Sequence, residues 1–195
     1  MLVREIMSQH PVTTTPDASV REALVVLAEH RVTALPVLDR GGRLVGIVSE
    51  GDLIRHVVNE DPRAHERPVT TEHEERPLVA DIMSPLPIVV RPAADVASAV
   101  RLMTTRSFKS LPVVDDADRL VGVLSRSDVV RAVARPDDEV AHEIEVHLAE
   151  AGLGHWTAEV DDGSVRLVGP DDDGDRALAH LVAATVPGVL EVVPS

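Results

Sequence analysis

The sequence predicts an α+β protein made of two copies of one β-α-β-β-α unit and a small α-β-β-α-β domain. The segment 46–55 reads GIVSEGDLIR, and the segment 122–131 reads GVLSRSDVVR. Residues 3–55 align without a gap with residues 79–131, at a constant offset of 76 and with 20 identities in 53 positions. An internal duplication of this length indicates two copies of one supersecondary unit. The chain after residue 135 differs in charge and in the order of its predicted elements.

The elements of each copy follow from local patterns. Ser19 and Glu22 have the spacing of a capping box, and helical spacing of apolar residues follows them. In the second copy Asp95 can cap the corresponding helix. Two short β-rich runs flank a turn, and a second helix begins at the repeated Ser-x-x-Asp. The first copy thus has a strand at 11–15, a helix at 19–30, strands at 34–38 and 44–48, and a helix from 49; the second copy repeats them 76 residues later.

These patterns divide the chain into four segments. The first copy covers 1–58 and the second covers 79–135, and a polar, Pro-interrupted linker at 59–78 separates them. His65 and His73 lie in that linker, without the spacing of a metal site, so we interpret them as loop histidines. The fourth segment, 136–195, forms the C-terminal domain.

Composition excludes several functional classes. The chain has 195 residues, 44% hydrophobic residues and no cysteine, which excludes disulfides, thiolate metal sites and cysteine catalysis. The amino terminus lacks the pattern of a signal peptide and the apolar runs are too short to span a bilayer, so a cytoplasmic protein is expected. No nucleophile–base pair or pair of catalytic acids stands out, so no enzymatic activity is expected.

Charge is distributed unevenly along the chain. Of the net charge of −14, residues 1–135 carry −2 and residues 136–195 carry −12. An acidic surface of this kind argues against binding to nucleic acid or anionic lipid, because both require neutralising cations.

The C-terminal domain has its own predicted order of elements. Helices are expected at 136–153 and 175–186, and strands at 156–160, 165–169 and 188–193. The pair of strands is joined through an Asp-Gly turn signal. The core faces of the two helices are predicted from helical spacing as Val140, Ile144, Leu148 and Ala151, and as Leu178, Leu181, Val182 and Val186.

With LPV before a hairpin and G-h-h-S-x-x-D (h apolar) before a helix in each copy, residues 1–135 resemble a tandem pair of cystathionine-β-synthase (CBS) domains. The resemblance implies that the two units pack as a pseudo-symmetric pair, that modules form a homodimer, and that the pair binds an adenosine-containing ligand. Candidate ligands are AMP, ADP, ATP, S-adenosylmethionine and NAD, and no cofactor is required.

The repeated Ser-x-x-Asp supports two compatible interpretations. Ser49 with Asp52, and Ser125 with Asp128, each fit a helix-capping box. A helix N-terminus also suits a phosphate, and a carboxylate can accept hydrogen bonds from vicinal ribose hydroxyls. By the resemblance, both Asp residues would hold ribose, and both Ser residues would lie near ribose or phosphate. The adenine slot would be lined by the segments that contain Thr13, Ala34, Leu35, Pro36 and Val37 in the first copy, and Val89, Ser110, Leu111, Pro112 and Val113 in the second.

The copies differ in charge at the candidate sites. Arg126 follows Ser125, whereas Glu50 follows Ser49, and Lys109 replaces Thr33. Because a phosphate needs cations, the second copy is predicted to hold a phosphorylated nucleotide more tightly, and the first to bind a less charged ligand or stay empty. The alternative is that Arg126 is an ordinary solvated helix residue.

Residues 136–195 resemble a BON domain, a family found in bacterial stress and envelope proteins, through DGSVRLVG and VPGVLEVV. Gly163, Gly169 and Gly188 lie where that family tends to need glycine. The resemblance implies binding to phospholipid or to a partner; the negative charge favours a protein partner, or an intramolecular contact with the CBS pair. We therefore expect an adenine-nucleotide sensor that relays its state through the acidic domain. The alternatives are an assembly protein with unoccupied sites, and a peripheral membrane regulator.

Overall fold

The computed structural model describes residues 1–57, 77–170 and 172–193, and these residues form two compact units. The hairpin unit comprises Ser8–Pro92 and Leu102–Leu124, and the C-terminal unit comprises Met1–Met7, Ala93–Arg101 and Ser125–Ser195. The expected linker with His65 and His73 lies outside the described residues, apart from Pro77 and Leu78. No helix in the described part of the chain has both the length and the apolar character needed to cross a bilayer.

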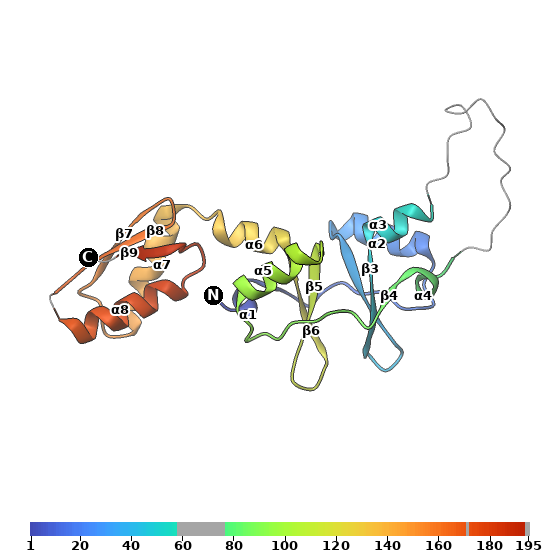
Figure 1. Cartoon of the computed structure of the whole chain (residues 1–195), viewed down its shortest axis with the longest axis horizontal. Coiled ribbons are helices and arrows are strands. Elements are labelled where there is room, and N and C mark those ends of the chain that lie inside the picture. Colours follow the sequence, from blue (N-terminus) through green and yellow to red (C-terminus); the bar gives the residue numbers. More distant parts are fainter. Residues whose placement is uncertain (58–76, 171, 194–195) are drawn as a thin grey trace, which may run out of the picture. The chain divides into compact units, whose positions relative to one another are not determined.

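The hairpin unit contains two three-stranded sheets with the orders β2-β3-β4 and β1-β6-β5 (Figure 1). Their strands are β1 (Ser8–Gln9), β2 (Ala34–Leu38), β3 (Leu44–Ser49), β4 (Ser84–Pro85), β5 (Ser110–Val114) and β6 (Leu120–Ser125). The first copy also contributes α2 (Val20–His30) and α3 (Glu50–Arg55) to this unit, and α4 (Val79–Ile82) precedes β4. Each sheet therefore contains a strand from the other copy.

The strand exchange between the copies is symmetric in its register. Ser84 pairs with Ile47 in one sheet, and Ser8 pairs with Val123 in the other, so both pairs are related by the offset of 76 residues. The β-rich runs at 11–15 and 87–91 were expected to be full strands. Each contributes only one parallel bridge, Thr14 to Val37 and Val90 to Val113. Prolines bracket both runs and remove the donors that a longer ladder needs.

The core of the first copy follows its predicted helical face. Val20, Ala23 and Leu27 of α2 are buried with the β2 and β3 side chains Leu35, Val37 and Val48. The capping box is also confirmed, because Ser19 Oγ accepts the Glu22 N–H at 3.2 Å and the Glu22 carboxylate accepts the Ser19 N–H at 2.8 Å. The local sequence signals therefore predict the start and the buried face of this helix correctly.

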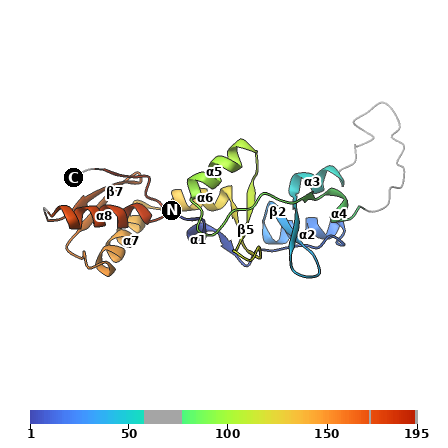
Figure 2. The ribbon, with the colours of Figure 1, turned by 60° about the horizontal axis from the view of Figure 1, so that its bottom comes forward.

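The C-terminal unit includes a sheet of order β7-β8-β9 with α7 and α8 beside it, as Figures 1 and 2 show from two directions. Its elements are α1 (Val3–Ile6), α6 (Arg126–Val133), α7 (Asp137–Glu150), β7 (Thr157–Asp161), β8 (Ser164–Val168), α8 (Asp173–Thr185) and β9 (Glu191–Val193); α5 (Val96–Thr105) contributes residues to both units. The predicted order α-β-β-α-β after residue 135 is thus confirmed.

In the C-terminal domain (136–195), the predicted core face is correct for α7 and partly wrong for α8. Val140, Ile144 and Leu148 are buried, whereas Ala151 follows the end of α7 and is exposed. On α8, Ala179 and Ala183 are buried with Val186, while Leu178 and Leu181 are exposed. Alanine allows α8 to lie close to its neighbours, so the small residues of the helix, rather than its leucines, occupy the core.

Candidate functional site

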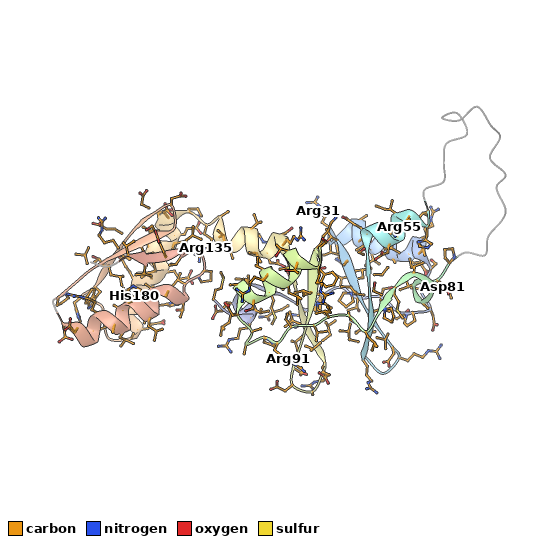
Figure 3. All side chains as sticks on the ribbon, viewed as in Figure 1. Arg31, Arg55, Asp81, Arg91, Arg135 and His180 are labelled. Carbon is orange, nitrogen blue, oxygen red and sulfur yellow. The ribbon has the colours of Figure 1, made fainter. Side chains whose placement is uncertain are left out.

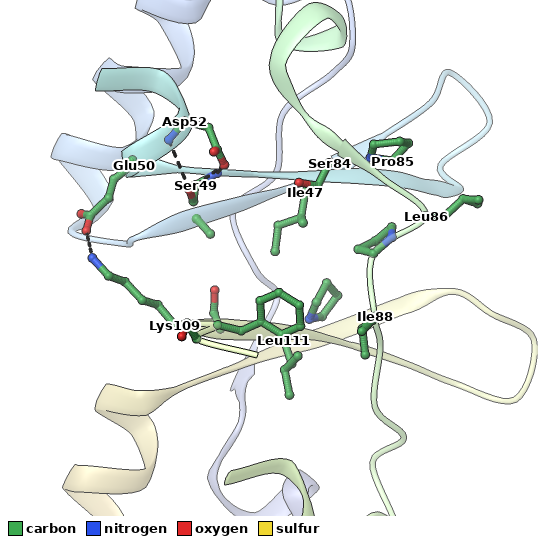
Figure 4. Close-up of a pocket in the computed structure, with 17 residues that line it drawn as sticks. Ile47, Ser49, Glu50, Asp52, Ser84, Pro85, Leu86, Ile88, Lys109 and Leu111 are labelled. Carbon is green, nitrogen blue, oxygen red and sulfur yellow. Dashed lines mark hydrogen bonds and ion pairs between the residues drawn. The ribbon is translucent and has the colours of Figure 1, made fainter. Parts of the chain in front are cut away.

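A cavity of about 490 Å³ opens in the hairpin unit, between the sheets of the two copies (Figure 4). This volume lies within the range of small-molecule binding sites. The first copy contributes Ala34, Ile47 and the start of α3, and the second copy contributes the β4 segment and the start of β5. The full lining is Ala34, Ile47, Ser49, Glu50, Gly51, Asp52, Ser84, Pro85, Leu86, Pro87, Ile88, Ser107, Phe108, Lys109, Ser110, Leu111 and Pro112.

The Ser49–Asp52 motif caps α3 and also faces the cavity. Ser49 N–H and Ser49 Oγ donate to Asp52 Oδ2 at 3.1 and 2.6 Å, and Asp52 N–H donates to Ser49 Oγ at 3.3 Å. These bonds use a single carboxylate oxygen. Within the described residues, Oδ1 of Asp52 has no hydrogen-bond partner, and the side chain is only half-buried. The capping interpretation is correct, and it leaves one acceptor available at the cavity wall.

Gly46 explains why the repeated motif begins with glycine. A Cβ at this position would lie 2.6 Å from Met83 Sδ and 3.2 Å from the Ser84 carbonyl oxygen. The missing side chain lets β4 of the second copy pair closely with β3 of the first. This approach brings the segment 84–88 to the cavity.

An ion pair bridges the two copies at the cavity. The ammonium group of Lys109, a residue of the second copy, pairs with the carboxylate of Glu50 in the first copy, as the dashed line in Figure 4 indicates. The two side chains are 57% and 36% exposed, so water reaches the pair. Lys109 was expected to serve the second motif together with Arg126. The structure instead places Lys109 with Ser49, Glu50 and Asp52, and Arg126 does not line this cavity.

The second motif repeats the cap in a more closed setting. Ser125 N–H and Ser125 Oγ donate to Asp128 Oδ2 at 2.7 and 2.6 Å. The other carboxylate oxygen, Oδ1, accepts from the Arg131 guanidinium group. The Asp128 side chain is 4% exposed. Both oxygens of Asp128 are thus engaged by the protein.

The remaining predicted site residues are divided between cavity and core. Ala34, Ser110, Leu111 and Pro112 line the cavity, together with the motif residues of the first copy. Leu35, Pro36, Val37 and Val113 are buried and do not line the cavity, because both faces of β2 and β5 are covered. Thr13 lines a separate hollow beside the two hairpin turns, and Val89 is half-buried outside the cavity lining.

Sequence reasoning missed one half of the cavity wall. The candidates did not include Ile47, Glu50, Gly51, the segment 84–88, Ser107 and Phe108. Each copy had been treated as carrying its own site, whereas the cavity joins the first motif to strands of the second copy. The symmetric repeat was a usable signal, because two short edge segments of a duplicated unit can exchange partners.

The described residues offer little for metal or catalytic chemistry. No cluster of three or more His, Asp or Glu side chains in the described ranges is arranged to hold a metal ion. The polar groups of the cavity are one capped carboxylate, one ion pair and backbone or hydroxyl groups. Such a site can bind through hydrogen bonds, apolar contact and charge.

The comparisons with known proteins agree with the repeat. The family model "CBS domain" matches residues 3–59 and 79–135. The chloroplastic CBS domain-containing protein CBSX2 of Arabidopsis thaliana is 36% identical over 133 residues, which are 60% of this chain and 56% of that protein. The chain therefore spans little more than half the length of this relative. An uncharacterised protein of Methanocaldococcus jannaschii is 29% identical over 68% of this chain and 91% of its own length.

Solved structures have the same fold over the repeat. The structure of CBSX2 in complex with AMP superposes with a TM-score of 0.55 at 36% identity, and covers 67% of this chain and 94% of that chain. The CBS domain pair of protein MJ0100, in complex with 5′-methylthioadenosine and S-adenosyl-L-methionine, superposes with the same TM-score at 27% identity over 67% of this chain and 94% of that chain. With both copies matched in sequence and fold, this chain belongs to the CBS domain family.

Proposed function

We propose that this protein is a regulatory sensor that binds an adenosine-containing ligand in the cavity between its two CBS copies. The carrying observation is the free carboxylate oxygen of Asp52, which lies on a cavity wall that is otherwise mostly apolar. A carboxylate can accept hydrogen bonds from both hydroxyls of a ribose. The apolar side chains Ile47, Leu111 and Ile88 offer contact surface for a purine ring.

The relatives support this choice of ligand. One was solved with AMP and another with 5′-methylthioadenosine and S-adenosylmethionine, and all three molecules carry an adenosyl group. No catalytic step is part of the proposal, because the Ser49 hydroxyl, which lies beside the Asp52 carboxylate, is engaged in the helix cap. The proposed location is the cytoplasm, and the proposed assembly is a homodimer, which light scattering would test.

The C-terminal domain is proposed to relay the ligand state to a protein partner, in line with its BON-like sequence. Support comes from the junction between α6 and α7. Arg135, labelled in Figure 3, donates to the Pro187 carbonyl oxygen at 3.1 Å and pairs with Glu143 at 2.7 Å. Asp137 accepts the N–H groups of Asp162 and Gly163 at 2.8 and 3.1 Å. Arg135, two residues after α6, thus contacts the domain, and Asp137 joins the start of α7 to the β7–β8 turn within it.

Thermal unfolding and calorimetry with AMP, ADP, ATP, S-adenosylmethionine and NAD test the proposed ligand class. A ligand at 100 times its Kd should add about 2.7 kcal/mol of stability to the wild-type protein. Asp52→Asn keeps an oxygen for the cap but replaces the free acceptor with a donor, so it should abolish the ligand effect while the variant stays folded. If none of the five ligands binds at millimolar concentration, the Ser–Asp pairs are helix caps only, and an assembly role replaces the sensor.

A further inference from the structure

We propose that the cavity selects adenosyl ligands whose 5′ substituent carries no net negative charge, and that Glu50 sets this selection. The inference rests on the proposed adenosyl binding and adds the ligand class. The ion pair between Glu50 and Lys109 lies beside Asp52 in the cavity lining.

The charged groups of the cavity do not favour an anion. Among the lining residues, only Glu50, Asp52 and Lys109 carry charge, so the site has two carboxylates and one ammonium group. The ammonium group is already engaged by Glu50. An incoming phosphate would have to compete with Glu50 for Lys109, and it would meet the uncompensated charge of Asp52. Like charges brought together in this way weaken binding.

The geometry places the ion pair where a 5′ substituent would reach it. Glu50 and Asp52 are two residues apart at the start of α3, and Figure 4 shows the ion pair at one end of the cavity, with Leu86 and Ile88 toward the other. A ribose held by Asp52, with its purine against the apolar end, directs its 5′ carbon toward Glu50 and Lys109. A thioether leaves the ion pair intact, and a sulfonium or ammonium group gains an attraction to Glu50.

The sequence of the other copy supports the assignment to Glu50. Arg126 occupies the position 76 residues after Glu50, so the charge next to the motif is reversed between the copies. The Gly, Ser and Asp that define the motif are the same in both copies and have the same spacing, although Gly51 is replaced by Ser127. The charge at this one position therefore varies independently of the cap.

The test compares three probes that share the adenosyl group, namely AMP, 5′-methylthioadenosine and S-adenosylmethionine. Calorimetry on the wild-type protein should give at least about tenfold tighter binding of 5′-methylthioadenosine than of AMP. Glu50→Gln retains the size of the side chain and frees Lys109, so AMP should tighten by about tenfold while 5′-methylthioadenosine changes by less than about threefold. Glu29→Gln is the matched control, because it removes the same charge from an exposed position of α2 outside the cavity.

Two further measurements assign the effect to this cavity. Binding that disappears in Asp52→Asn belongs to the cavity, and any remaining binding is subtracted as arising elsewhere. The preference for 5′-methylthioadenosine over AMP should shrink at high salt, because the charged pair is exposed to solvent.

The failures of the two proposals are distinguishable. If AMP binds the wild-type cavity as tightly as 5′-methylthioadenosine and Glu50→Gln leaves the ratio unchanged, charge selection is overturned while adenosyl sensing stands. If no probe binds at millimolar concentration, both proposals fail. A change in the ratio with Glu29→Gln that equals the change with Glu50→Gln also overturns the role of Glu50.

Discussion

The two Ser–Asp motifs have the same cap and differ in what happens to the second carboxylate oxygen. In both, Ser Oγ donates to Asp Oδ2 at 2.6 Å. In the second copy the Arg131 guanidinium group donates to Oδ1 of Asp128, and the Asp128 side chain is buried. In the first copy Arg55 (labelled in Figure 3) occupies the equivalent position without an ion pair to Asp52, whose Oδ1 stays available at the cavity. The same sequence motif thus has both carboxylate oxygens engaged in one copy and one oxygen available at the cavity in the other.

The largest expected effect separates the two aspartates by stability. Asp128→Ala removes the acceptor of a part-buried Ser125 N–H and the partner of Arg131, so it should lower the free energy of unfolding by about 2 to 3 kcal/mol. Asp52→Ala removes a cap that water can replace in part, and should cost about 1 kcal/mol. Urea unfolding followed by circular dichroism measures both losses. Equal losses would contradict the distinction between a closed and an open motif.

The next effect should be the same in the two copies. Ser49→Ala and Ser125→Ala each remove a hydroxyl that accepts the N–H of the third helical residue, at 3.3 and 3.2 Å. Each substitution should therefore lower the free energy of unfolding by about 1 kcal/mol. Hydrogen exchange at the starts of α3 and α6 would locate the two losses. A loss in one copy only would mean that the caps are not equivalent.

Comparison of the copies also explains what could be predicted from sequence. The helices, hairpins and caps followed from local signals such as the Ser19–Glu22 spacing, because these depend on residues within one or two turns. The family resemblance predicted the paired fold, which the structure confirms over the repeat.

The cavity could not be predicted in the same way. Both Arg55 and Arg131 follow their motifs at the same spacing, so the sequence does not reveal that only Arg131 pairs with the Asp. Lys109 is 59 residues from Glu50, and their contact depends on how the two copies pack. On α8 the leucines were assigned to the core by hydrophobicity alone, although the alanines permit the closer packing.

A smaller effect is expected for Arg131 itself. Its own side chain is 71% exposed, but its partner Asp128 is 4% exposed, so removing the guanidinium group leaves a buried carboxylate oxygen without its cation. Arg131→Gln keeps an N–H donor for that oxygen but loses the positive charge, and should cost up to about 1 kcal/mol, whereas Arg55→Gln should cost less because it breaks no ion pair to Asp52. Thermal unfolding of both variants measures the difference. A large loss for Arg131→Gln would mean that the guanidinium group, rather than the buried cap, stabilises this end of α6.

The smallest expected effect is a pH dependence of stability that α2 has, through Glu22, and that the equivalent position of α5 lacks. Hydrogen bonds from the Ser19 N–H and then the Ser19 hydroxyl lower the pKa of Glu22 below its ordinary value of 4.5, whereas the equivalent residue in α5 is Ser98, which does not titrate. Because the pKa of Glu22 is lower in the folded state, its contribution is complete above 4.5 and is lost as the pH falls through the lowered value. NMR titration should therefore find the pKa of the Glu22 carboxyl below 4.5, and Ser19→Ala, which removes the hydroxyl donor but keeps the backbone N–H, should raise this pKa part of the way toward 4.5. An unchanged Glu22 pKa in Ser19→Ala would contradict the contribution of the Ser19 hydroxyl, and Glu22→Gln should flatten only this small part of the acid dependence of stability.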